Sequence, residues 1–231
     1  MRNRKISLIL TILALPSLVW GVIADARQDG KSAESSFFYR FENKRFFIPL
    51  IEIDLSAAGT GEVRFKRGEA DEIIDRKLTV LPTTASRIRQ LYDVTKFISS
   101  TAEYQDKKDF SHLGWVTLGA RDGGRERKTK FNYTQNLEIK ELSDIFRALA
   151  TQEIDLLDIE NARQYQPLDL PHLLDTLEND LGLGRIAEPQ QMLATLKDIS
   201  GDDSQPLIAR NHASRMMAAI KNGKFKSPVG K

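Results

Sequence analysis

The chain of 231 residues contains no cysteine. It can therefore form no disulfide bond, no thiolate nucleophile and no cysteine-ligated metal site. Histidine is also scarce, with three residues far apart in the sequence, and neither a G-x-S-x-G nor an S-x-x-K motif occurs. These absences argue against nucleophilic catalysis and against a zinc site, and we expect no metal and no cofactor.

Long apolar runs are also lacking, apart from one at the N-terminus. Basic residues at positions 2, 4 and 5 precede this run, which extends from Ile6 to Ala24 and is followed by Asp25 and Ala26. The order predicts a secretory signal peptide over residues 1–26, cleaved after Ala24 or Ala26. Because the run approaches the ~20 residues that span a bilayer, an uncleaved membrane anchor is the alternative. In either case we expect an exported protein, periplasmic or extracellular.

Neither sign of charge is in excess after residue 26, where 31 basic residues stand against 31 acidic ones. Residues 27–136 carry 20 basic and 16 acidic side chains, residues 137–203 carry 5 and 15, and residues 204–231 carry 6 and none. We expect these surfaces to face one another within the fold, and a polar partner for one of them is the alternative. The overall neutrality argues against nucleic-acid binding.

Residues 27–46 are predicted to be a polar linker followed by an aromatic lead-in. Six of the sixteen Phe and Tyr residues lie between positions 37 and 47. These side chains form either a first strand or lead-in packed on the core, or a binding surface for sugars or lipid headgroups. We favour packing on the core, because large aromatic side chains contribute most to core burial.

Residues 47–136 are predicted to form an α+β unit around a small antiparallel sheet. Apolar and polar residues alternate with period two on either side of the turn at Gly59-Thr60-Gly61, which predicts a hairpin. Pro82 is typical of a helix start. The expected order is strand-strand-strand-helix-strand-strand, with strands at 51–55, 62–66, 72–80, about 115–119 and about 128–133.

Residues 137–221 are predicted to be helical. Apolar residues recur there at helical spacing, and proline and glycine residues interrupt the pattern. The last residues, 222–231, form a basic tail that we expect to be loose. The predicted helices are 137–165, 171–182, 189–199 and 206–221.

Residues 189–221 contain two of these helices, joined by a turn with Asp202 and Asp203, and Arg210 lies three residues before Ala213. This segment resembles a single HEAT-type helical repeat. The resemblance implies a HEAT-like helical region in which Asp203 and Arg210 act as a structural lock between neighbouring repeats. An ordinary helical hairpin is the alternative, since solenoids need about three or more units. The N-terminal half is more loosely similar to small secreted bacterial domains of unknown function.

A basic segment surrounds the glycine pair at 123–124. It is either an anion-binding finger for phosphate headgroups, envelope polymers or an acidic partner, or a charged hairpin that keeps an exposed strand from pairing with other chains. We favour the structural interpretation. The candidate interaction residues are Arg121, Arg125, Arg127, Lys128 and Lys130.

Together these patterns favour an exported, non-catalytic envelope or interaction protein whose acidic helical half docks a protein partner. One alternative is a hydrolase of cell-envelope material that uses carboxylates such as Glu52 and Asp54. Another is a membrane-anchored structural subunit, because membrane contact is expected only if the signal is retained. The sequence names no catalytic residue and leaves the oligomeric state open.

Overall fold

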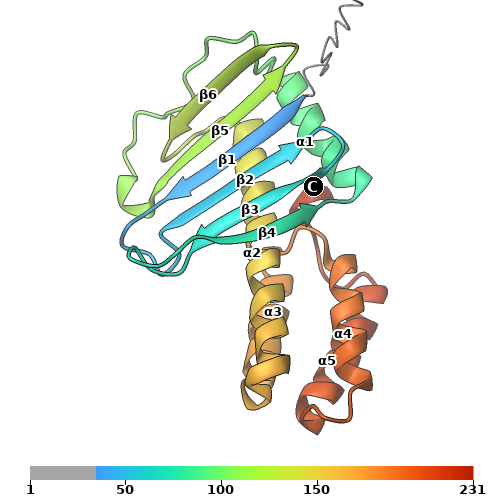
Figure 1. Ribbon diagram of the computed structural model, residues 1–231. Coiled ribbons are helices and arrows are strands. Elements are labelled where there is room, and N and C mark those ends of the chain that lie inside the picture. The colour runs from blue at the N-terminus through green and yellow to red at the C-terminus, as the bar shows by residue number, and fades with distance from the viewer. Residues whose placement is uncertain (1–34, 231) are drawn as a thin grey trace, which may run out of the picture. The chain divides into compact units, whose positions relative to one another are not determined.

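Strand alternation builds a six-stranded antiparallel sheet in the order β4-β3-β2-β1-β5-β6 (Figure 1). The computed structural model describes residues 35–230, so the predicted signal peptide lies outside the described residues. The α+β class is confirmed, with four strands, a helix and two strands before a helical region. The strands are β1 (Ser36–Glu42), β2 (Leu50–Ser56), β3 (Thr60–Lys66), β4 (Ile74–Thr79), β5 (Trp115–Asp122) and β6 (Arg125–Phe131).

The sheet has one strand more than the five expected from alternation, because the aromatic lead-in is a strand. β1 pairs with both β2 and β5 and is therefore a central strand of the sheet. Its buried residues are Phe37, Tyr39 and Phe41, whereas the residues between them are only partly buried. The consecutive aromatics at 37–39 hide this period of two, since Phe38 is apolar but lies on the other face.

Two helices, α1 (Pro82–Val94) and α2 (Leu137–Tyr165), cover one face of the sheet, and α2 passes behind it in Figure 1. Tyr39 of β1 stacks on Phe146 of α2 with ring centroids 5.5 Å apart. Tyr92 of α1 stacks on Phe37 at 4.8 Å. Within residues 35–230 the opposite face carries no helix, and the half-buried polar residues of the strands lie there.

The second half of α2 leaves the sheet and packs with three further helices below it (Figure 1). The side chains from Ile139 to Ala150 belong to the sheet core, while Ile159 and Ala162 belong to a second apolar cluster. One continuous helix therefore joins the two parts of the fold, as expected from its length. The further helices are α3 (Leu170–Gly182), α4 (Met192–Gly201) and α5 (Leu207–Lys221), with single 3₁₀ turns at Ser111–Leu113, Pro167–Asp169, Pro189–Gln191 and Pro228–Gly230.

The acidic face of α2 meets basic residues of the sheet unit. Arg87 of α1 donates two hydrogen bonds to Glu141, at 2.6 and 2.7 Å. Arg76 of β4 contacts Glu160 at 2.9 Å and also pairs with the buried Glu153. The expectation that the basic first part and the acidic middle of the chain face one another is confirmed at these pairs.

A buried carboxylate connects the segment before α4 to the start of α1. Glu188 is 2% exposed, and its Oε1 accepts a hydrogen bond from the backbone N–H of Leu81 at 2.7 Å. Its own backbone N–H donates to the side chain of Gln152 on α2 at 2.9 Å. Burial raises the pKa of Glu188, while hydrogen bonds from Thr84, Leu81 and Gln191 oppose that rise. This network fixes the helical region to the corner between β4 and α1.

The C-terminal tail is packed rather than loose. Ser227 donates a hydrogen bond to the carbonyl of Ala187, and Val229 packs against the sheet core. The expectation of a loose tail was based on its basic, Gly- and Pro-containing composition. Composition alone could not predict that Val229, close to the C-terminus, packs against the apolar core.

Candidate interaction surfaces

The open face of the sheet is a lattice of paired charges. Arg40 of β1 donates to Glu52 of β2 at 2.8 Å, and Arg64 of β3 binds Asp54 of β2. Glu52 and Asp54, the carboxylates that suggested a hydrolase, are therefore both held by arginine side chains. Among residues 35–230, no group of three or more His, Asp or Glu is arranged to hold a metal ion. In this geometry both carboxylates are engaged in ion pairs between neighbouring strands.

The β5–β6 hairpin carries three of its five predicted basic residues on the open face. Arg121 and Lys128 both bind Glu126, at 2.8 and 2.9 Å. Hydrogen bonds from Lys128 and Arg121 lower the pKa of Glu126 to about 2. Lys130 lies 3.4 Å from Glu42 and over the ring of Trp115. Each of these three cations is therefore paired with a carboxylate of the sheet, although Arg121 and Lys128 share the same one.

Arg127 lies on the other face and performs a packing role. Its guanidinium donates to the carbonyls of Phe97 and Ala102, at 2.7 and 2.5 Å. It also lies over the rings of Phe97 and Tyr104, with 4.7 and 5.3 Å to their centroids. Arg127 thus holds the segment after α1 against the sheet. Arg125 is the first residue of β6, next to the turn between the two strands. The five residues do not form one anion-binding finger.

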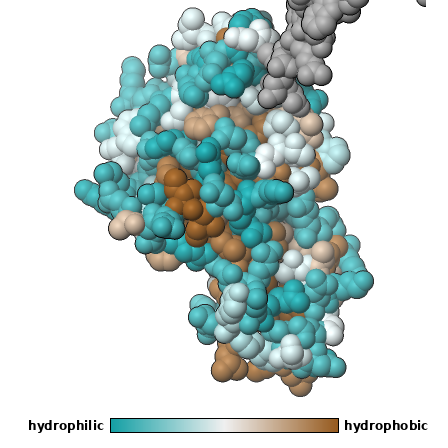
Figure 2. Space-filling view, in the orientation of Figure 1, coloured by the Kyte–Doolittle hydropathy of each residue, from teal (hydrophilic) through white to brown (hydrophobic). Residues whose placement is uncertain are grey.

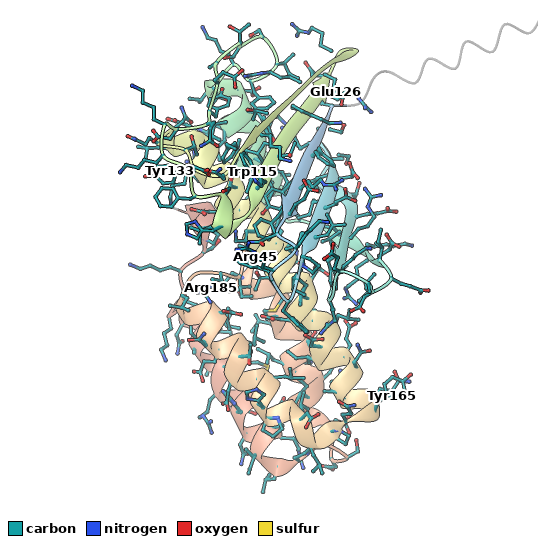
Figure 3. All side chains as sticks on the ribbon, turned by 90° about the vertical axis from the view of Figure 1, so that its left-hand side faces the viewer. Arg45, Trp115, Glu126, Tyr133, Tyr165 and Arg185 are labelled. Atoms are coloured by element: carbon teal, nitrogen blue, oxygen red, sulfur yellow. The ribbon has the colours of Figure 1, made fainter. Side chains whose placement is uncertain are left out.

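A groove of about 470 Å³ lies on the open face near the first residues of β2 and β5. Trp115 and Arg45, both visible in Figure 3, line it together with Lys66 and Lys130. Most of the cations around it hold a carboxylate, as Lys130 holds Glu42. The groove is therefore a weaker anion site than its number of basic residues suggests.

Asp203 and Arg210 are brought together, but within a single hairpin. Arg210 Nη2 lies 2.5 Å from Asp203 Oδ1, and the Asp203 side chain is 89% exposed. The tie between hairpins comes instead from Arg163 on α2. Its guanidinium lies 3.8 Å from Asp202, and its carbonyl accepts a hydrogen bond from Gln205. Arg163 was missed because it lies outside the repeat-like segment 189–221.

The two turns at the far end of the helical region carry four exposed large apolar side chains. We call this group the distal tip: Tyr165 (69% exposed), Leu168 (85%), Leu207 (65%) and Ile208 (72%). Tyr165 and Leu168 lie between α2 and α3, and the other two begin α5. Figure 2 shows apolar surface at this lower end, and Figure 3 shows Tyr165 projecting away from the helices. Grouped exposed apolar side chains of this size mark interaction sites.

Comparison with known proteins adds no family to these observations. No protein-family model matches the chain, and no curated protein is significantly similar to it in sequence.

Proposed function

We propose that this protein is an exported, non-catalytic interaction protein that binds a protein partner through the distal tip. The observation that carries the proposal is the grouping of four large apolar side chains, each at least 65% exposed, on two neighbouring turns. Singly scattered apolar residues need no explanation, but a group of this kind does. A rigid helical surface also loses little conformational entropy on binding.

The charges around the distal tip indicate what the partner presents. Asp169, Asp198, Asp202 and Asp203 belong to the two turns or the helix ends next to them, and Arg163 and Arg210 there are already engaged by three of these carboxylates. Residues 163–169 and 198–210 contain four aspartates and two arginines, so these two turns carry a net negative charge. A partner segment with apolar side chains flanked by lysine or arginine complements such a surface.

Export is part of the proposal and is based on the predicted signal peptide. No helix within residues 35–230 is long and apolar enough to cross a bilayer. The mass of the N-terminal peptide of the native protein tests export directly. A chain that begins at Asp25 or Arg27 supports the proposal, whereas an intact Met1 contradicts cleavage and favours the anchored subunit.

Site-directed photocrosslinking tests the tip. A photoreactive amino acid placed at Leu168 or Ile208 should crosslink the same partner in the native envelope. The matched control is Leu137, which is 75% exposed at the start of α2, at the other end of that helix. The purified partner should then bind the Ile208→Glu variant at least about ten-fold more weakly, and bind Leu137→Glu as it binds the parent protein.

Two results would contradict the proposal. One is a set of crosslinks that is the same at position 137 as at the two tip positions. The other is equal affinity of the purified partner for Ile208→Glu and Leu137→Glu. Weakening of the complex by salt is expected, since charge complementarity contributes to it.

A further inference from the structure

A second site lies at the opposite end of the molecule. A pocket of about 330 Å³ opens where α1 ends, β1 begins and β5 turns into β6. The stacked rings of Phe37 and Tyr92 lie at its base, with centroids 4.8 Å apart. Four cations and two carboxylates line it: Arg89, Lys96, Arg121 and Arg125, with Asp93 and Asp122.

The four cations of this pocket differ in whether they already bind another group of the protein. Arg121 is bound to Glu126 at 2.8 Å, and Arg89 donates to the carbonyl of Ala57 at 2.7 Å. Lys96 and Arg125, by contrast, form no ion pair with any carboxylate of residues 35–230. Lys96 at the end of α1 and Arg125 at the start of β6 both line this pocket, so an anion inside it could be bound by two cations that no carboxylate of residues 35–230 occupies.

The backbone at Lys96 gives an independent reason to expect a role for its side chain. Helix α1 ends in a Schellman motif, in which Phe97 N–H donates to the Tyr92 carbonyl and Lys96 N–H donates to the Asp93 carbonyl. Lys96 takes the left-handed position with φ of +47°, the one positive φ outside glycine in the described range. Glycine is the usual residue there, because a Cβ atom is unfavourable in this conformation.

Stability alone therefore does not explain a lysine at this position. Residues held in unfavourable backbone conformations concentrate at ligand sites. The Lys96 side chain lines the pocket, so its ammonium group provides a reason for lysine where glycine would be more stable.

We propose that this pocket binds a small organic phosphate monoester. The phosphate would lie between Lys96 and Arg125, since guanidinium and ammonium groups are both established phosphate ligands. The pocket volume exceeds that of a phosphate ion and falls in the range of small-molecule sites, so an apolar organic group can occupy the base. Asp93 and Asp122 at its edge disfavour ligands with several phosphates. This site is separate from the protein-docking function proposed above.

Calorimetric titration of the full-length protein with phenyl phosphate tests this site, with inorganic phosphate as the comparison probe. Phenyl phosphate should bind saturably at one site and more tightly than inorganic phosphate. Lys96→Gly should raise the midpoint of thermal unfolding, because it relieves the left-handed position, and yet weaken binding about ten-fold or more. Arg125→Ala should weaken binding similarly.

Lys128→Ala is the control, because Lys128 pairs with Glu126 and does not line this pocket. The proposal is overturned if Lys96→Gly and Lys96→Ala both bind phenyl phosphate as the parent does. It is also overturned if no saturable binding occurs, or if the two probes bind equally, which would indicate general attraction to positive charge.

Discussion

At the scale of single residues, Asp155 on α2 lies in an unfavourable environment for a carboxylate. One of its oxygens is buried and accepts no hydrogen bond within residues 35–230. Burial, with Asp180 and Asp158 nearby, raises the pKa of Asp155 to about 7. Arg67 is paired with Asp158 and Arg185 with Asp180, and within residues 35–230 no cation forms an ion pair with Asp155.

This environment makes stability depend on pH in a defined direction. The folded-state pKa of Asp155 lies above the ordinary value of 3.8, so the native state holds its proton more tightly than the unfolded state. Its contribution to stability is therefore complete below about pH 4 and is lost as the pH rises towards 7. Asp155→Asn should stabilise the protein by about 1–3 kcal/mol at pH 8 and leave it unchanged at pH 4. Thermal unfolding at both pH values measures this.

Asp158→Asn provides the contrast on the same helix. It removes the partner of Arg67 and should lower the unfolding temperature at pH 8. A stabilisation of Asp155→Asn that is equal at pH 4 and pH 8 would show that the carboxylate charge is not its cause.

Single residues also show where sequence reasoning reaches its limit. The basic composition of 121–130 was visible, and so was the alternation that makes it a hairpin. The partners of these basic residues could not be predicted, because they are distant in the sequence. Glu42, which pairs with Lys130, is 88 residues away, and Phe97, which accepts a hydrogen bond from Arg127, is 30 residues away. Such distant residues determine which cations have a carboxylate or carbonyl partner, so the sequence alone does not show it.

At the scale of elements, α1 shows the same limit. Proline at position 82 predicted its start correctly, because proline suits the first turn of a helix. The start lacks a local capping side chain, and Glu188 binds the N–H of Leu81 from 107 residues away. The local sequence therefore predicts where α1 begins, whereas the hydrogen bond to the Leu81 N–H comes from a residue that only the tertiary fold brings close.

Removal of this contact should destabilise the protein. Glu188→Ala leaves the part-buried Leu81 N–H without its acceptor and should reduce the free energy of unfolding by about 1–3 kcal/mol. Glu188→Gln keeps a carbonyl acceptor and should lose less. Urea unfolding of the two variants measures the difference, and equal stability of Glu188→Ala and the parent protein would rule out this role.

At the scale of the whole molecule, the boundary suggested at residue 137 is not a boundary in packing. That boundary was inferred from a change in charge and in hydrophobic periodicity along the chain, and neither of these predicts which side chains pack together. The apolar clusters do not follow it, because α2 contributes to both. The helical boundaries themselves agree closely with those predicted, since long periodic segments carry the clearest signal.

Continuity of α2 should make the two clusters unfold together. Calorimetry should show one transition for the parent protein. Thr151→Pro interrupts α2 between the clusters and should separate the transition into two or abolish the bundle part. Leu137→Pro is the matched control, because position 137 is the first of the helix and accepts proline. A single unaltered transition in Thr151→Pro would contradict this coupling.

The length of α2 has a consequence for assembly. Leu157 is the last residue of α2 that packs against the sheet core, and the helix continues to Tyr165, which at 1.5 Å per residue extends roughly 12 Å farther. The pocket proposed to bind phosphate lies at the other end of the fold and shares no lining side chain with the distal tip. Occupancy of one should leave the affinity of the other nearly unchanged, because well-separated sites without common partners contribute additively. Under the two proposals made above, one molecule would bind its protein partner and its phosphate ligand at the same time, and neither would compete with the other.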